Sequence, residues 1–321
     1  MISERRHAIL GLIIEHYLRT GEPIGSKTLC QLLPYSISSA TIRNEMAYLT
    51  QLGFLEQRHT SGGRVPSKAS YRYYVDNIMQ EKPISKYETD KINEALSVNS
   101  GDPERLLADA CKLLEEYSHC AAFCATLEDP YDCIQGVDLI PAGNQKAMLV
   151  MLTVGSKIKS SLINMPCALD EDFRKKFYEV SAKFLTGTPL TNVNLALIQS
   201  AVGVAGERIF DMLPALSSLC ALCNEASHSK LTLEGETNLL SHSELGSDLY
   251  KILGLLTEKK QLMELSKSFA NSNSKQLLLI GDENPIYEMK NTSTVIAKYN
   301  YKKKKKAVLG VIGSMRIDYE S

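Results

Sequence analysis

The 321-residue sequence predicts an α+β fold, and three observations lead to that prediction. Apolar residues at helical spacing dominate residues 1–80, strand-like apolar runs separated by polar turns fill 134–165, and helical periodicity from 172 to 269 gives way to strands again. Strands, then helices, then strands are typical of an α+β domain that carries a mostly helical insertion. A content of 44% hydrophobic and 23% charged residues is that of a globular chain with a sizeable core.

The first 80 residues have the element order of a small helical domain with a hairpin. We expect helices at 4–20, 26–33 and 39–52, short strands at 54–57 and 64–65, and an aromatic-rich helix from 67 to 79. Gly21 ends the first helix, Ser26 is the expected N-cap of the second, and Pro34 closes it because the residue before a proline avoids the α region. Three helices followed by a hairpin predict a winged helix-turn-helix.

The remainder of the chain is expected to divide into a linker, an α+β domain and an insertion. The predicted elements are a helix at 103–117, strands at 134–141, 146–154 and 158–165, helices at 172–185, 194–202, 206–224 and 245–269, and strands at 276–280, 294–299 and 307–312. The predicted division is a winged helix at 1–80, a linker at 81–101, the first part of the α+β domain at 102–169, an inserted dimerisation segment at 170–240 and the second part at 241–321.

Charge and composition limit the function classes. Residues 1–80 hold nine Lys or Arg and six Asp or Glu, a net charge of +3, which leaves −4 for the rest of a chain that sums to −1. A basic segment attached to an acidic body is typical of a nucleic-acid module on a regulatory region, although so small an excess also arises by chance. No apolar run is long enough to span a membrane, no signal peptide is evident, and the eight cysteines fit reduced thiols, so we expect a cytoplasmic protein.

The third helix has the features of a DNA reader. Ile42, Met46 and Leu49 form its buried stripe, and the opposite face combines two small alanines with polar side chains. Asn and Gln can pair with adenine edges and Arg with guanine or phosphate, although a surface helix with ordinary polar residues is the simpler interpretation. The candidate DNA-binding residues are Ser26, Lys27, Thr28, Ser39, Thr41, Arg43, Asn44, Tyr48, Gln51, Arg58, His59, Arg64 and Lys68, of which Arg43, Asn44, Tyr48 and Gln51 are expected to face bases and the flanking residues to contact the backbone.

Several runs of sequence carry a family resemblance. The runs at 20–29 (TGEPIGSKTL), 39–47 (SATIRNEMA) and 59–66 (HTSGGRVP) resemble signatures of HrcA, a family of heat-inducible transcription repressors. Blocks at 235–240 (GETNLL), 280–284 (IGDEN) and 310–319 resemble later parts of the same family. The chain departs from the family pattern where Ser314 and Met315 follow Gly313 in place of a usual proline, and where Ile317 replaces a common Met.

The resemblance implies a repressor without catalytic activity. Members of this family bind double-stranded DNA at an inverted repeat, the CIRCE operator of chaperone operons, as homodimers. The resemblance also implies that a GAF-like domain follows the winged helix, that the inserted segment makes much of the dimer contact, and that the chaperonin GroEL modulates the protein, with release on heat stress. Two alternatives stay open, because the α+β body could instead be a small-molecule sensor or an intrinsic thermosensor.

Other constellations point to structure more than to chemistry. Cys220 and Cys223 near His228 lack a second pair, so buried small side chains are the better interpretation than zinc, and Cys120 and Cys124, expected one helical turn apart, are interpreted alike. We expect no metal and no cofactor, since no phosphate-binding glycine loop is present. The five lysines at 302–306 are expected to form a solvated hairpin loop, with an accessory contact to DNA or to an acidic partner as the alternative.

Overall fold

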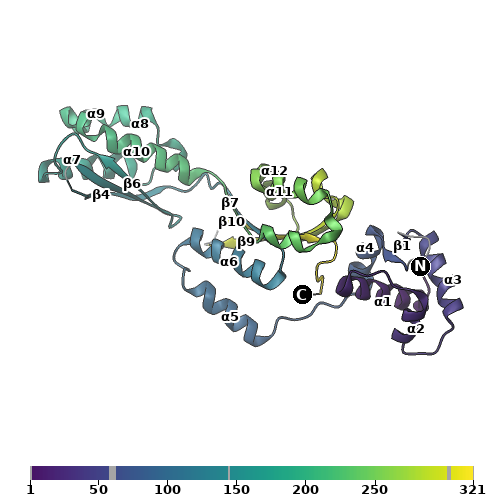
Figure 1. Cartoon of the computed structure of the whole chain (residues 1–321). Helices are drawn as coiled ribbons and strands as arrows, with labels where there is room; N and C mark the ends of the chain where they lie inside the picture. The colour runs from purple at the N-terminus through teal and green to yellow at the C-terminus, as the bar shows by residue number, and fades with distance from the viewer. Residues whose placement is uncertain (1, 58–62, 144, 302–304, 321) are drawn as a thin grey trace.

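The computed structural model describes residues 2–57, 63–143, 145–301 and 305–320, and it shows an elongated chain made of three compact parts (Figure 1). The N-terminal helices form one end, which we call the head. A five-stranded sheet with its helices forms the centre, which we call the body, and a three-stranded sheet with its helices forms the other end, which we call the distal unit. Helices and antiparallel sheets together confirm the predicted α+β class.

The head follows the predicted element order. It contains α1 (Glu4–Thr20), α2 (Ser26–Leu32), α3 (Ser39–Gln51), β1 (Leu55–Glu56), β2 (Val65–Pro66) and α4 (Lys68–Asn77). Gly21 ends α1 in the left-handed conformation, with φ of 72° and its N–H donating to the carbonyl of Tyr17. The N-cap of α2 is Gly25, so the prediction that Ser26 caps this helix was wrong by one residue. Strands β1 and β2 pair antiparallel, with Leu55 opposite Pro66.

The body is built on one antiparallel sheet in the order β7-β3-β10-β9-β8. Its strands are β3 (Ala121–Thr126), β7 (Lys230–Glu234), β8 (Gln276–Ile280), β9 (Thr292–Tyr301) and β10 (Lys305–Ser314), and its helices are α5 (Lys86–Ser97), α6 (Pro103–Ser118), α11 (Asp248–Glu258) and α12 (Lys260–Ala270). Buried residues of α6 pack on one face of the sheet, and buried residues of α11 and α12 pack with the other face. The body is therefore a layer of strands between two layers of helices.

Three features of the body differ from the sequence-based expectation. The interval 81–101, predicted as a linker, contains α5, which begins with a capping box between Ser85 and Glu88. The single helix expected at 245–269 is two helices, since Lys259 takes a left-handed φ of 58° between them. Strands β3 and β7 were missed, and β3 places Cys124 on a strand rather than on a helical turn with Cys120. β3 is buried on both faces, so it shows no alternation of polar and apolar residues.

The distal unit joins the three strands predicted at 134–165 to the helices that follow them. It contains β4 (Ile134–Pro141), β5 (Lys146–Thr153), β6 (Ile158–Asn164), α7 (Glu171–Val180), α8 (Leu195–Ser200), α9 (Val202–Ala205) and α10 (Ile209–Ser227). One buried cluster extends from Ile134 to Ala226 and includes Leu149, Phe173 and Met212. The predicted boundary between 169 and 170 divides this cluster, because the apolar face of the small sheet is buried by the helices that come after it.

Shorter helical turns complete the elements. They are a π-helical turn at Ser181–Leu185 and 3-10 turns at Leu190–Asn192, Gly206–Arg208, Glu236–Ser241, Ser243–Leu245, Gly281–Glu283 and Tyr287–Met289. Within the part of the chain that the structure describes, no helix has the length and apolar character needed to cross a membrane.

Charged contacts fix the head to the body through α4 and the turn that follows β8. Arg72 donates from Nε to Glu283 over 2.8 Å, from Nη2 to the same carboxylate, and from Nη2 to the carbonyl of Leu278 over 2.8 Å. One turn earlier on α4, Lys68 pairs with Asp282 over 3.0 Å. The hydrogen bonds from Arg72 hold the pKa of the Glu283 carboxyl below its usual range.

The last residues of the chain add a second set of contacts between body and head. Arg316 donates from Nε to the carbonyl of Tyr17 over 3.1 Å and from Nη2 to that of Leu18 over 3.3 Å, which places a cation at the C-terminal end of α1. Tyr74 of α4 donates to the Glu320 carboxylate over 2.7 Å. Ile280 of β8 is buried in the same apolar cluster as the head core. Head and body therefore share a core as well as ion pairs.

Candidate nucleic-acid interface

Helix α3 presents a capped start and one polar face. The Ser38 side chain accepts from the Thr41 backbone N–H over 3.1 Å, so Ser38 is the N-cap. Ile42, Met46 and Leu49 are buried, as the helical pattern predicts. This burial fixes the rotation of α3 against the head, and the opposite side of the helix therefore faces outward.

The candidate residues on α3 gather on that outward side. Ser39, Arg43, Asn44, Tyr48 and Gln51 are exposed, Thr41 is half-buried, and the small residues Ala40 and Ala47 are exposed among them. A protruding helix with small side chains between polar ones can approach a base-pair edge closely. Arg43, Asn44 and Gln51 offer donors and acceptors of the kind that read the major groove.

Helix α2 and the hairpin flank α3. Lys27 and Thr28 are exposed near the start of α2, and Ser26 is half-buried. The hairpin is joined to the chain before α2 by two backbone hydrogen bonds of 3.0–3.1 Å between Ile24 and Arg64. A Cβ on Gly63 would lie 2.5 Å from the Ile24 carbonyl oxygen, so only glycine permits this approach. Among the described residues, none accepts a hydrogen bond from the buried Nε of half-buried Arg64.

Two parts of the predicted set stand apart. Arg58 and His59 lie outside the described residues. Lys68, predicted to hold the DNA backbone, starts α4 and pairs with Asp282 of the body. Its ammonium group is therefore engaged at the contact between head and body.

Sequence reasoning missed a basic pair beside α3. Arg5 and Arg6 of the first turn of α1 both pair with Glu45 of α3, with distances from Nε to the carboxylate of 3.2 and 2.6 Å. The guanidinium carbon of Arg6 also lies 3.8 Å from the centre of the Tyr48 ring. A signal was present in the sequence, because Arg6 precedes Ile9 and Leu10 at spacings that put it on the buried side of α1.

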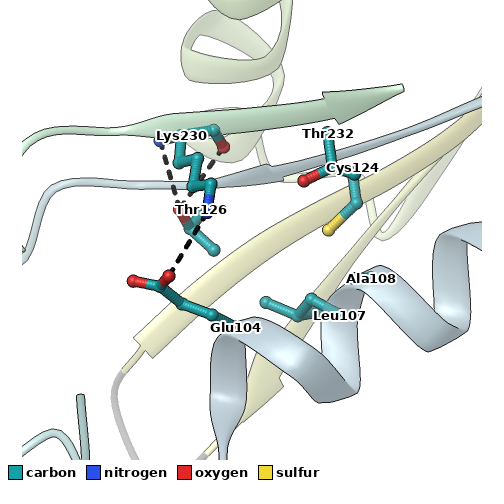
Figure 2. Close-up of a pocket in the computed structure, with 7 residues that line it drawn as sticks. All are labelled: Glu104, Leu107, Ala108, Cys124, Thr126, Lys230 and Thr232. Carbon is teal, nitrogen blue, oxygen red and sulfur yellow. Dashed lines mark hydrogen bonds and ion pairs between the residues drawn. The ribbon is translucent and has the colours of Figure 1, made fainter. Parts of the chain in front are cut away.

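A small cavity lies in the body between α6 and the sheet (Figure 2). It measures about 50 Å³ and is lined by Glu104, Leu107, Ala108, Cys124, Thr126, Lys230 and Thr232. Glu104 pairs with Lys230 across its edge over 3.3 Å, and burial raises the pKa of the Cys124 thiol to about 12. Pockets for small organic ligands are usually about 300–1,000 Å³, so this cavity has room only for water-sized molecules.

A family model and curated relatives agree on one family. The family model described as "HrcA protein C terminal domain" matches residues 104–321. The chain is 32% identical over 324 residues to the "Heat-inducible transcription repressor HrcA" of Lachnoclostridium phytofermentans, covering 99% of this chain and 93% of that protein. It is 30% identical over 320 residues to the protein of the same name from Acetivibrio thermocellus, covering 99% and 91%. A crystal structure described as that of a hypothetical protein has the same fold, with a TM-score of 0.71 at 21% identity over 100% of this chain and 94% of that one.

Proposed function

The chain belongs to the HrcA family of heat-inducible transcription repressors, which are not enzymes, and on this premise we propose that its head is a winged helix-turn-helix that reads operator DNA with α3. The observation that carries the proposal is the outward face of α3, where Arg43, Asn44 and Gln51 stand exposed among small alanines. Lys27, Thr28 and Arg64, on the two elements that flank α3, would contact phosphates and hold the helix in register. Hairpin residues 58 and 59 would add contacts as the wing.

The proposed operator is the inverted repeat CIRCE, bound by a homodimer. One short helix reads few base pairs, so two heads related by a twofold axis on a palindrome double the readout. The distal unit offers a surface for this dimer. One face of its sheet is covered by helices, whereas the other is open and carries two apolar rows on either side of a row of Asp138, Val150 and Ser160. Ile140, Met148 and Leu162 form one apolar row across the three strands, and Leu152 and Ile158 lie in the other.

Exposed apolar rows of this kind favour burial against a second copy. Ile158 is 66% exposed and Leu162 63% exposed, although both lie on a regular strand. In this proposal residues 134–226 are the inserted dimerisation segment, and the body is the GAF-like domain. We further propose that the repressor acts in the cytoplasm and leaves its operator on heat stress, with GroEL as the modulator.

Fluorescence anisotropy on a duplex with the inverted repeat and on a scrambled duplex, over a salt series, tests the DNA proposal. We expect a preference for the repeat that persists as salt rises. Asn44→Ala should weaken binding by ~1–3 kcal/mol on the repeat alone, whereas Lys27→Ala should weaken both duplexes alike. Equal losses on both duplexes for Asn44→Ala would show that Asn44 does not read bases. Measurements with and without added GroEL separate chaperonin control from intrinsic melting.

Sedimentation velocity tests the dimer. Leu162→Asp places a charge on the open face of the distal sheet and should shift the protein to monomer. Leu195→Asp is the matched control, since Leu195 is also exposed but lies on α8, among the helices of the distal unit. An unchanged dimer in the Leu162→Asp variant would exclude this face as the interface.

A further inference from the structure

We propose that Arg5 and Arg6 in the first turn of α1 form a second DNA-contacting surface, which binds backbone phosphates beside the groove that α3 enters, with Glu45 as its positioning residue. The inference rests on the proposed DNA-binding function of the head and extends it to residues outside the helix-turn-helix and the wing. Its starting point is one buried carboxylate on α3 that holds two arginines of another helix.

The geometry fixes the two arginines at the edge of α3. The Glu45 side chain is 8% exposed, whereas those of Arg6 and Arg5 are 29% and 53% exposed. Both ion pairs use Nε, so Glu45 leaves the Nη groups of both guanidinium ions for other acceptors. No other described residue accepts a hydrogen bond from them. Two cations paired with one carboxylate leave one positive charge in excess. The nearby acidic residue Glu4 does not neutralise Arg6, because Glu4 is exposed about 160° around α1 from it.

Tyr48 connects this pair to the outward face of α3. The guanidinium carbon of Arg6 lies over its ring, 3.8 Å from the ring centre. On a helix, Tyr48 neighbours Asn44 four residues before it and Gln51 three residues after it. Arg6 is therefore one side chain away from two expected base-reading residues. The Tyr48 ring therefore holds the Arg6 guanidinium in place. In this proposal Tyr48 positions Arg6 instead of making the predicted base contact.

The dimensions of DNA place phosphates at this edge. A helix with its side chains is about 10–12 Å across and the major groove is about 12 Å wide, so an inserted helix fills the groove from wall to wall. Side chains on the flank of that helix consequently meet the phosphates that line the groove. Glu45 and Tyr48 lie on such a flank, between the buried stripe and the outward face, and they hold Arg5 and Arg6 there. A guanidinium group matches the geometry of a phosphate with two parallel hydrogen bonds.

The salt dependence of DNA binding tests the proposal. Arg5→Gln and Arg6→Gln should each lower the slope of log affinity against log salt by about 0.9 for every phosphate that the variant no longer neutralises, equally on the repeat and on the scrambled duplex. Arg19→Gln is the matched control, because Arg19 is exposed on the last turn of the same helix and its replacement removes the same charge. Slopes for Arg5→Gln and Arg6→Gln that equal the Arg19→Gln slope would overturn the proposal.

A double variant separates DNA contact from a structural role. If Arg6 only neutralises the buried carboxylate, Glu45→Gln/Arg6→Gln removes both charges together and should restore the wild-type slope. If Arg6 contacts phosphate, the slope stays low in the double variant, and Glu45→Gln alone should weaken binding, since both arginines lose their anchor. Because the predicted contact does not depend on sequence, the slopes can be measured on any duplex. A wild-type protein without preference for the repeat would refute the proposed operator and still leave this contact open to test.

Discussion

Replacing Arg72 with Ala should loosen the attachment of the head to the body. Three hydrogen bonds from its guanidinium join α4 to Glu283 and to the Leu278 carbonyl. A buried hydrogen bond to a charged group contributes about 1.5–3 kcal/mol, whereas an exposed ion pair contributes about 0.2–1 kcal/mol. The side chains of Arg72 and Glu283 are 31% and 37% exposed, so solvent screening lowers the sum. We expect Arg72→Ala to cost the docked state about 1–2 kcal/mol.

Hydrogen exchange followed by mass spectrometry measures this cost. Amides of α4 and β8 that exchange through undocking should exchange about 5–30 times faster in Arg72→Ala, which corresponds to that free energy. Asp76→Ala is the matched control, because Asp76 contacts Arg72 within α4 over 3.4 Å and forms no ion pair with any described residue of the body. Its exchange should remain close to that of the wild type.

The pH dependence gives a second test of the same contact. Arg72 lowers the pKa of Glu283 in the folded chain, so the pair stabilises the docked state fully above the ordinary carboxyl pKa near 4.3. That contribution is lost as the pH falls through the lower pKa of the folded state. The coupling between Arg72→Ala and Glu283→Ala in a double-mutant cycle should thus vanish in acid. A coupling near zero at neutral pH, or equal exchange in Arg72→Ala and Asp76→Ala, would refute the reasoning.

Three further predictions concern the body. Gly310→Ala should lower the free energy of unfolding in urea by about 1–3 kcal/mol, because its Cβ would lie 2.5 Å from the Phe123 ring. Phe123→Leu in the same chain should recover part of the loss. Additive effects of the two substitutions on the free energy of unfolding would contradict this explanation. Burial opposes ionisation of Glu244, but hydrogen bonds from His242 and other groups and the charge of Arg316 lower the Glu244 pKa to about 2. Glu244→Gln should therefore cost about 2 kcal/mol at neutral pH and much less at pH 2, where the folded carboxyl is half protonated. An equal loss at both pH values would exclude this cause. Burial raises the Cys111 pKa to about 12, so iodoacetamide should label this thiol only after unfolding, and rapid labelling of the native protein would contradict its burial.

Local patterns in the sequence were sufficient to predict the head. Gly21, the stripe of Ile42, Met46 and Leu49, and the serine that caps α3 act within a few residues of themselves, so helix ends and buried faces could be predicted without knowing the rest of the chain. The outward face of α3 follows from its buried stripe. The candidate base-reading set on α3 was therefore visible in the sequence, and its contacts with DNA stay predictions.

Tertiary structure decided which segments share a core and which charges meet. Strand β3 is buried on both faces and has no alternating pattern of polar and apolar residues. The sequence of the strands at 134–164 does not show whether they join the central sheet or form a separate one. Arg72 and Glu283 are 211 residues apart, and Arg6 and Glu45 are 39 apart, so no local spacing relates them. The sequence predicted that Lys68 binds phosphate, but in the structure Asp282 of the body pairs with it. The sequence by itself determined the helices of the head and their exposed faces, because these depend on neighbours along the chain, whereas the partners of each charge depend on long-range packing.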